Sequence, residues 1–205
     1  MPNLLIGITG SVASIKLSFL IEALLEKAPE LCIRVVVTES SKHFVKEALQ
    51  ISQQDSLEII TKSNQRIRVF DDSCEWKAWN KIGDHVLHIE LRKWADIFLI
   101  APLDANSLGK ISNGLCDNLL TCIIRAWDCT DPLKRVIVAP AMNTMMWDHP
   151  LTSKHLKCLK EDLKYLVIPP IAKTLACGDS GIGAMASVED IAQYVIIVFK
   201  DLALL

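Results

Sequence analysis

The chain lacks the features that mark membrane-spanning, secreted or nucleic-acid-binding proteins. No apolar stretch approaches the roughly 20 residues that cross a bilayer, and Met1 to Asn3 lead into an apolar segment without a basic leader. Lysine and arginine number 22 against 24 acidic residues, and no run concentrates them, which argues against a nucleic-acid surface. We therefore expect a soluble, cytoplasmic protein.

Cysteine and glycine are also not arranged in the familiar motifs. The seven cysteines form no C-x-x-C pair and their number is odd, so neither a disulfide framework nor a thiolate zinc site is indicated. His85 and His88 lack a set of further ligands at metal-binding spacing, so we expect no metal. G-x-G-x-x-G and G-x-x-x-x-G-K-[ST] are both missing, so a dinucleotide or nucleoside triphosphate site lacks its signature.

What the chain does contain is a series of short apolar runs that alternate with helix-like spacing. Its 205 residues, 51% of them hydrophobic, suffice for one domain over residues 1–205. Continuous apolar strands alternating with helices are typical of a parallel sheet buried on both faces. We predict a single-domain α/β fold with strands at 4–9, 32–38, 96–101, 135–139 and 165–168, and helices near 17–25, near 41–49 and after the capping residue Ser187.

The polar segment 53–84 does not fit this alternation. It offers a short strand candidate at 67–69 and the pair Trp76 and Trp79. We expect this segment to run over the surface.

The polar residues that could carry chemistry follow the predicted strands. Gly10 and Ser11 end the first strand and open a helix, which suits one phosphate group or a simple helix cap. A turn rich in small polar groups, 104–107, follows the strand at 96–101. Cys177 is followed by Gly178, Gly181 and Gly183. Such a thiol is placed either for chemistry on an adaptable loop or incidentally in a surface turn.

Three longer motifs carry a resemblance to a known family. They are Pro-Leu-Asp-Ala-Asn-Ser at 102–107, Pro-x-Met-Asn-x-x-Met-Trp at 140–147, and Ala-Cys-Gly-Asp-x-Gly-x-Gly-Ala-Met at 176–185. Together they resemble the homo-oligomeric flavin-containing cysteine decarboxylases, and among them those that act on 4'-phosphopantothenoylcysteine. The likeness extends from Thr9 to the last helix, and Ser107 replaces the threonine of the family's first motif.

The resemblance implies a flavodoxin-like (Rossmann-like) sheet that binds FMN, and a homotrimer with active sites between subunits. His88 then matches the catalytic histidine and Cys177 the proton donor, while Asn143, Ala176 and Gly178 match substrate-binding positions. The matching FMN-binding positions are Gly10, Ser11, Val12, Phe44, Asp104, Ala105, Asn106, Ser107 and Ala141.

The activity that the resemblance implies is the FMN-dependent decarboxylation of 4'-phosphopantothenoylcysteine to 4'-phosphopantetheine in coenzyme A biosynthesis. A flavin-binding regulatory subunit, which inhibits a phosphatase or joins mixed trimers, is the first alternative. Another flavin enzyme, such as a prenyltransferase or a peptide cysteine decarboxylase, is the second. Read without the resemblance, His88 is a surface or core histidine and Asn143 is a helix cap.

Overall fold

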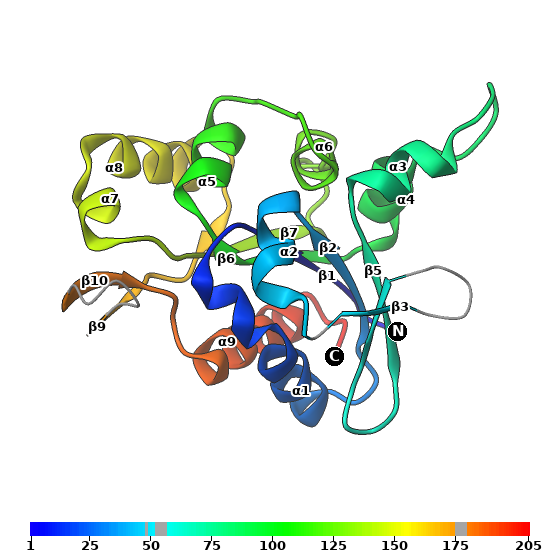
Figure 1. Ribbon diagram of the computed structural model, residues 1–205, viewed down its shortest axis with the longest axis horizontal. Coiled ribbons are helices and arrows are strands. Elements are labelled where there is room, and N and C mark those ends of the chain that lie inside the picture. Colours follow the sequence, from blue (N-terminus) through cyan, green and yellow to red (C-terminus); the bar gives the residue numbers. More distant parts are fainter. Residues whose placement is uncertain (48, 52–56, 175–179) are drawn as a thin grey trace.

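A sheet runs through the middle of the molecule, and helices cover both of its faces (Figure 1). The computed structural model describes residues 1–47, 49–51, 57–174 and 180–205. The strands are β1 (Asn3–Ile8), β2 (Cys32–Val37), β3 (Gln50–Ile51), β4 (Leu57–Ile60), β5 (Arg66–Phe70), β6 (Ile97–Leu103), β7 (Arg135–Pro140), β8 (Leu166–Val167), β9 (Ile171–Thr174) and β10 (Ser180–Ala184). The α-helices are α1 (Leu17–Lys27), α2 (Glu39–Val45), α3 (Asp72–Ala78), α4 (Leu87–Trp94), α5 (Ala105–Ser112), α6 (Leu119–Arg125), α7 (Thr144–Asp148), α8 (Pro150–Lys157) and α9 (Val188–Asp201), with a 3-10 turn η1 (Val12–Lys16) and a π-helical turn η2 (Cys158–Asp162).

The order of the strands places a natural binding site between β1 and β6. The order of strands in the main sheet is β3-β4-β5-β2-β1-β6-β7-β8. The six strands β5, β2, β1, β6, β7 and β8 pair in parallel, while β4 pairs with β5 and β3 with β4 in antiparallel fashion at one edge. Numbered along the chain, the parallel strands follow the order 3-2-1-4-5-6, which reverses between β1 and β6. Ligands of open α/β sheets bind beyond the carboxyl ends of the strands at such a reversal.

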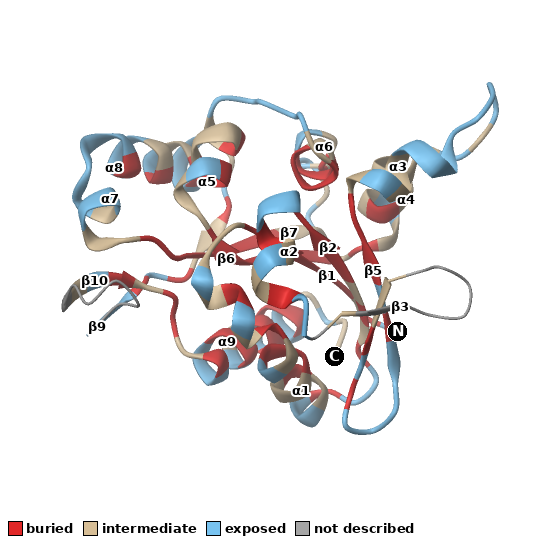
Figure 2. Ribbon diagram, in the orientation of Figure 1, coloured by how far each residue is buried: buried red, intermediate tan, exposed pale blue. Residues whose placement is uncertain are grey.

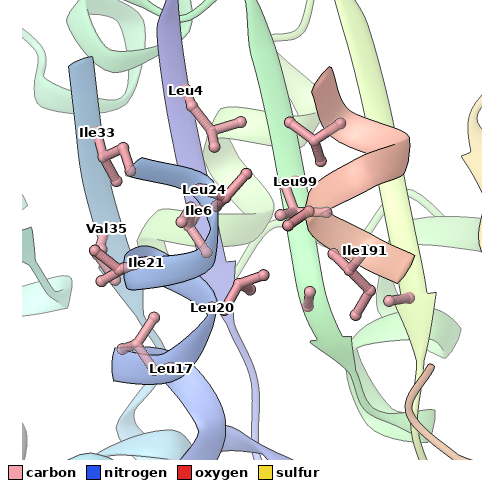
Figure 3. Close-up of a cluster of buried hydrophobic side chains, with 14 of the residues drawn as sticks. Leu4, Ile6, Leu17, Leu20, Ile21, Leu24, Ile33, Val35, Leu99 and Ile191 are labelled. Carbon is pink, nitrogen blue, oxygen red and sulfur yellow. The ribbon is translucent and has the colours of Figure 1, made fainter. Parts of the chain in front are cut away.

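Burial on both faces explains why the central strands are apolar without alternation. On one face α1 and α9 pack over the sheet, with Leu20 and Leu24 of α1 and Ile191 of α9 above Ile6 and Leu99 (Figure 3). On the other face α4, α5, α6 and α8 cover a second buried cluster that includes Phe98 and Trp127, whose ring centroids lie 5.8 Å apart. Figure 2 shows the buried residues gathered along the strands and on the inner sides of the helices.

The predicted α/β fold with helices on both faces of a parallel sheet is confirmed, and so is the start of the last helix. Ser187 caps α9 by accepting a hydrogen bond from the amide of Asp190 at 3.0 Å. Among the described residues, no helix is both long and apolar enough to cross a membrane.

The expectation that residues 53–84 run over the surface is wrong for β5. This strand pairs in parallel with β2 inside the sheet, and both Ile67 and Val69 are buried. Its exposed alternate residues are Arg66 and Arg68, so only three apolar side chains mark it in the sequence. The strand candidate at 67–69 is confirmed as part of β5, but its predicted placement on the surface is wrong, because a strand of five residues with charged neighbours resembles a surface segment.

One buried hydroxyl joins the ends of β1 and β6. The side chain of Thr9 donates to the carbonyl of Pro102 at 2.8 Å and accepts from the amide of Asp104 at 2.7 Å. Its own carbonyl accepts from the amide of Ser11 and from the hydroxyl of Ser14, each at 2.8 Å. The turns that follow the two strands are therefore fixed relative to each other.

Replacing Thr9 by valine tests this connection, because valine keeps the shape of threonine but has no hydroxyl. The amide of Asp104 loses its acceptor in a buried position, so we expect a loss of about 1–3 kcal/mol in the free energy of unfolding. Thr9→Ser keeps the hydroxyl and should preserve most of the stability. Denaturant titration measures both; a loss in Thr9→Ser without a loss in Thr9→Val would mean that the methyl group, and not the hydroxyl, matters.

Candidate active site

The turn after β1 is built around a glycine that allows three segments to meet. A Cβ placed on Gly10 would lie 2.6 Å from the hydroxyl oxygen of Ser40 and 3.1 Å from Oδ2 of Asp104. Ser11 follows and caps η1, where its side chain accepts from the amide of Ala13 at 3.3 Å. Polar groups from three strand ends thus surround the start of η1, which is the environment that an anion prefers.

The turn after β6 lies across from the start of η1 and completes these surroundings. Asp104 caps α5 by accepting a hydrogen bond from the amide of Ser107 at 2.7 Å. Ala105 and Asn106 lie in the first turn of α5. Because the cap uses Oδ1 of Asp104, Oδ2 remains directed toward Gly10.

A cleft of about 600 Å³ opens between these turns and the loop after β7. Its lining combines most of the residues predicted from the sequence with several that were not. The predicted ones are Gly10, Ser11, Val12, Asp104, Ala105, Asn106, Ala141 and Asn143; the others are Ala13, Ile15, Lys16, Met142, Met146, Lys173, Gly183, Ala184 and Met185.

Two cations that the sequence reasoning missed lie in this lining, Lys16 at the end of η1 and Lys173 in β9. Ser40, which touches the Gly10 turn, was missed as well. Ser40 follows β2 just as Ser11 follows β1. That shared position at a strand end is the signal that could have identified it.

The β9–β10 hairpin closes the cleft beside Asn143. The side chain of Asn143 caps α7 by accepting from the amide of Met145 at 2.8 Å, so the helix-cap interpretation is confirmed alongside its place in the cleft. The amide of Met142 donates to the carbonyl of Gly183 at 2.9 Å.

Glycine is required in this hairpin at two points. A Cβ on Gly183, whose φ is +149°, would lie 2.3 Å from the carbonyl oxygen of Met142, and one on Gly181 would lie 2.6 Å from Cγ2 of Thr144. The hairpin can therefore approach the loop after β7 this closely only because both positions lack side chains.

Three predicted positions lie in the segment 175–179, outside the described residues. They are Cys177, Ala176 and Gly178. The described residues on either side of the segment, Thr174 and Ser180, pair with each other in the β9–β10 hairpin. Lys173 and Gly183 of the same hairpin line the cleft.

Two predicted FMN positions, Phe44 and Ser107, do not belong to the cleft lining formed by the described residues. Ser107 is buried beneath the turn after β6. Phe44 lies on α2, where its ring meets that of His43 edge to face with centroids 5.2 Å apart. Neither position is tested by this geometry, and both remain predictions.

His88 stands apart from the cleft, at the beginning of α4. In Figure 1, α4 and the β9–β10 hairpin lie on opposite sides of the molecule. Nδ1 of His88 is 2.7 Å from Oε1 of Glu75, a residue of α3. Leu87, its neighbour, lines a second hollow of about 1020 Å³ between α2 and α3.

The second hollow is bordered by an ion pair between a partly exposed lysine and a buried aspartate. Nζ of Lys42, in α2, lies 2.7 Å from Oδ2 of Asp71, the residue that caps α3. Burial alone would raise the pKa of Asp71, but hydrogen bonds from Lys42, Ser73 and Cys74 outweigh it and hold that pKa well below its usual range. The pair therefore stays charged and joins α2 to the start of α3.

Comparisons with known proteins agree with this geometry. A model of the Flavoprotein family matches residues 1–200. A phosphopantothenoylcysteine decarboxylase of Arabidopsis thaliana is 54% identical over 185 residues, which cover 90% of this chain and 79% of the relative. A phosphopantothenoylcysteine decarboxylase of Mus musculus is 48% identical over 193 residues, which cover 94% of this chain and 85% of the relative.

Solved structures show the same likeness. A cysteine-to-serine mutant of PPC decarboxylase complexed with pantothenoylaminoethenethiol superposes with a TM-score of 0.82 at 48% identity, covering 97% of this chain and 98% of that one. The FMN binding protein AtHal3 gives a TM-score of 0.79 at 48% identity, with 98% and 97% covered. The resemblance seen in the motifs is confirmed, and the chain belongs to the flavoprotein family.

Proposed function

We propose that this protein is an FMN-dependent decarboxylase that converts 4'-phosphopantothenoylcysteine into 4'-phosphopantetheine and CO2 in coenzyme A biosynthesis. The observation that carries the proposal is the cleft at the reversal of strand order, where the Gly10, Asp104 and Asn143 turns meet. The names of the curated relatives agree with the predicted activity, and the flavoprotein family agrees with the predicted cofactor.

The residues of the cleft suit FMN. The amides at the start of η1, with the hydroxyls of Ser11 and Ser40, offer donors to a phosphate group. The Asp104–Asn106 turn and Ala141 supply small and polar surfaces beside it. Bound flavin would take a hydride from the carbon that bears the substrate's sulfur and return it later, so that the net reaction is redox-neutral.

The substrate would lie between the proposed FMN position and the β9–β10 hairpin. The amide of Asn143 can both donate and accept, as recognition of a carboxylate and an amide chain requires. Lys173 and Lys16 add positive charge to a cleft that must accept an acidic, phosphorylated substrate. Cys177 would supply the proton that completes the product, because a thiol is a far better proton donor than a hydroxyl and Cys177 matches the family's proton donor in sequence.

We further propose that the active unit is a homotrimer in which His88 of one subunit faces the cleft of its neighbour. Two features support this assembly. His88 is not among the described residues that line the cleft, and α4, which carries it, lies on the opposite side of the molecule from the β9–β10 hairpin (Figure 1). In addition, Val12, Ile15 and Phe19 form an exposed apolar row, 46%, 59% and 66% exposed, that begins in the cleft lining and continues into α1. Such a row suits contact with a second copy.

The first experiment tests the cofactor and the reaction together. Purified protein should be yellow, release FMN on denaturation, and produce CO2 from 4'-phosphopantothenoylcysteine. Gly10→Ala should weaken FMN binding by at least about tenfold, because the new Cβ would displace Ser40 from the turn. In Gly109→Ala the added Cβ meets only His155, at 3.6 Å, so this control should bind FMN normally.

Two outcomes would contradict this assignment. Folded protein that does not bind added FMN would rule out FMN as the cofactor. Protein that binds FMN but never releases CO2 would favour the regulatory-subunit alternative instead.

The second experiment separates the two halves of the reaction at Cys177. Serine keeps the size of the side chain, but its far higher pKa makes it a poor proton donor. Cys177→Ser should therefore oxidise and decarboxylate the substrate and then stop, leaving reduced flavin and a product two hydrogens short of 4'-phosphopantetheine. Mass spectrometry identifies the product, and fully reduced product formed at the wild-type rate would remove Cys177 from the mechanism.

The third experiment tests sites that are shared between subunits. His88→Asn and Asn143→Asp are each expected to be inactive, but trimers refolded from an equal mixture should regain activity in about a quarter of their sites, where one chain supplies His88 and another Asn143. Light scattering should give about three times the 22.8 kDa chain mass. Mixed trimers without recovered activity would mean that both residues act within one chain.

A further inference from the structure

We infer that Glu75 is a positioning residue for His88, fixing both the orientation of its ring and the nitrogen that carries the proton. The carboxylate of Glu75 faces two nitrogen atoms of the same residue, one in the ring and one in the backbone. Oε1 lies 2.7 Å from Nδ1 of His88, and Oε2 accepts from the backbone amide of His88 at 3.1 Å. The inference rests on the proposed catalytic role of His88.

The two contacts with Glu75 fix the orientation of the His88 ring. His88 lies in the first turn of α4, so its backbone amide is one of the donors that the helix itself leaves unused. By accepting from this amide, Oε2 anchors the carboxylate to the backbone of His88, and Oε1 is then held beside the ring of the same residue. A negative charge is also favourable at a helix N-terminus.

The contact also selects the tautomer. An ionised carboxylate can only accept hydrogen bonds, so Nδ1 must be the protonated nitrogen of a neutral ring. Nε2 is then left with its lone pair available for a substrate group. A histidine that receives or shares a proton at one defined atom needs this kind of partner.

The contact between Glu75 and His88 is less exposed to solvent than an ordinary surface contact. The side chain of Glu75 is 16% exposed and that of His88 is 26% exposed. For comparison, His85 lies 4.0 Å from Glu90, with side chains 87% and 43% exposed. Within the described part of the chain, His88 is the histidine that combines a partly buried ring with a carboxylate at hydrogen-bonding distance.

Glu75→Gln is the decisive variant. Glutamine has one acceptor oxygen and one donating nitrogen, so it cannot accept from both donors of His88. If its oxygen pairs with the backbone amide, its NH2 group faces Nδ1 and favours the opposite tautomer. We expect kcat to fall at least about tenfold with little change in KM, because the change affects a group that reacts and not one that binds substrate.

Glu90→Gln is the matched control. It makes the same substitution and removes the same charge, on α4 itself, but at the exposed Glu90. Its kcat should match the wild type. FMN content, trimer mass and thermal unfolding are measured for all three proteins, and Glu75→Gln should keep all of these properties near wild-type values.

Nitrogen-15 NMR of the histidine rings gives a readout that a merely structural role would not move. The signals of His88 are assigned by their loss in His88→Asn, at a pH where the ring is neutral. The wild type should carry the proton on Nδ1, and Glu75→Gln should shift the population toward Nε2.

Either of two results would overturn the inference. One is a neutral His88 ring that carries its proton on Nε2 in the wild-type protein. The other is a fall in kcat that occurs only together with lost FMN, broken trimers or lowered thermal stability, which would make Glu75 a tether between α3 and α4. If the wild type shows no decarboxylation at all, the proposed function fails, while the ring signals still decide the role of Glu75.

Discussion

The hydroxyl of Thr9 is the contact on which the arrangement of the cleft depends. It lies between β1 and β6, where the strand order reverses. The chain continues from these two strands toward opposite edges of the sheet, and the turns that follow them are far apart in the sequence. A single buried oxygen, used as both donor and acceptor, holds these two turns in register. The placement of Ser11 and Asp104 follows from that register, because the amide of Ser11 donates to the carbonyl of Thr9 and the amide of Asp104 donates to its hydroxyl. Gly10 lies between Thr9 and Ser11 and is placed with them.

Much of the fold could be predicted because strands that are buried on both faces are written as uninterrupted apolar runs. The strands near 4–9, 32–38, 96–101 and 135–139 are of this kind, and the site motifs follow directly after them. β5 was misjudged because charged residues alternate with its few apolar ones, and β4 gave no recognised signal. Lys173 and Glu75 were missed for another reason: the fold brings Lys173 to the cleft and Glu75 to His88, and sequence spacing alone does not show these contacts.

The groups proposed for catalysis are distributed over separate supports. The cleft is formed by strand ends and by a hairpin, whereas His88 is held by the packing of two helices at another part of the surface. Helices and strands hold their side chains more accurately than free loops do. In the proposed trimer, the distance between the histidine and the cleft would be set by the interface between subunits, so a small change at that interface would alter the reaction without altering either half of the site.

The close approach of Gly183 to Met142 is a contact between main-chain atoms. Apart from the glycines at 181 and 183, this contact uses only backbone groups that every residue other than proline carries, so it specifies the path of the hairpin without specifying the other side chains around it. Side chains such as those of Lys173 and Met146, which line the cleft but do not make this contact, are therefore open to replacement while the frame that carries them stays in place. That separation of frame and lining would allow one backbone to serve different thiol-bearing substrates through changes at positions such as Lys173 and Met146.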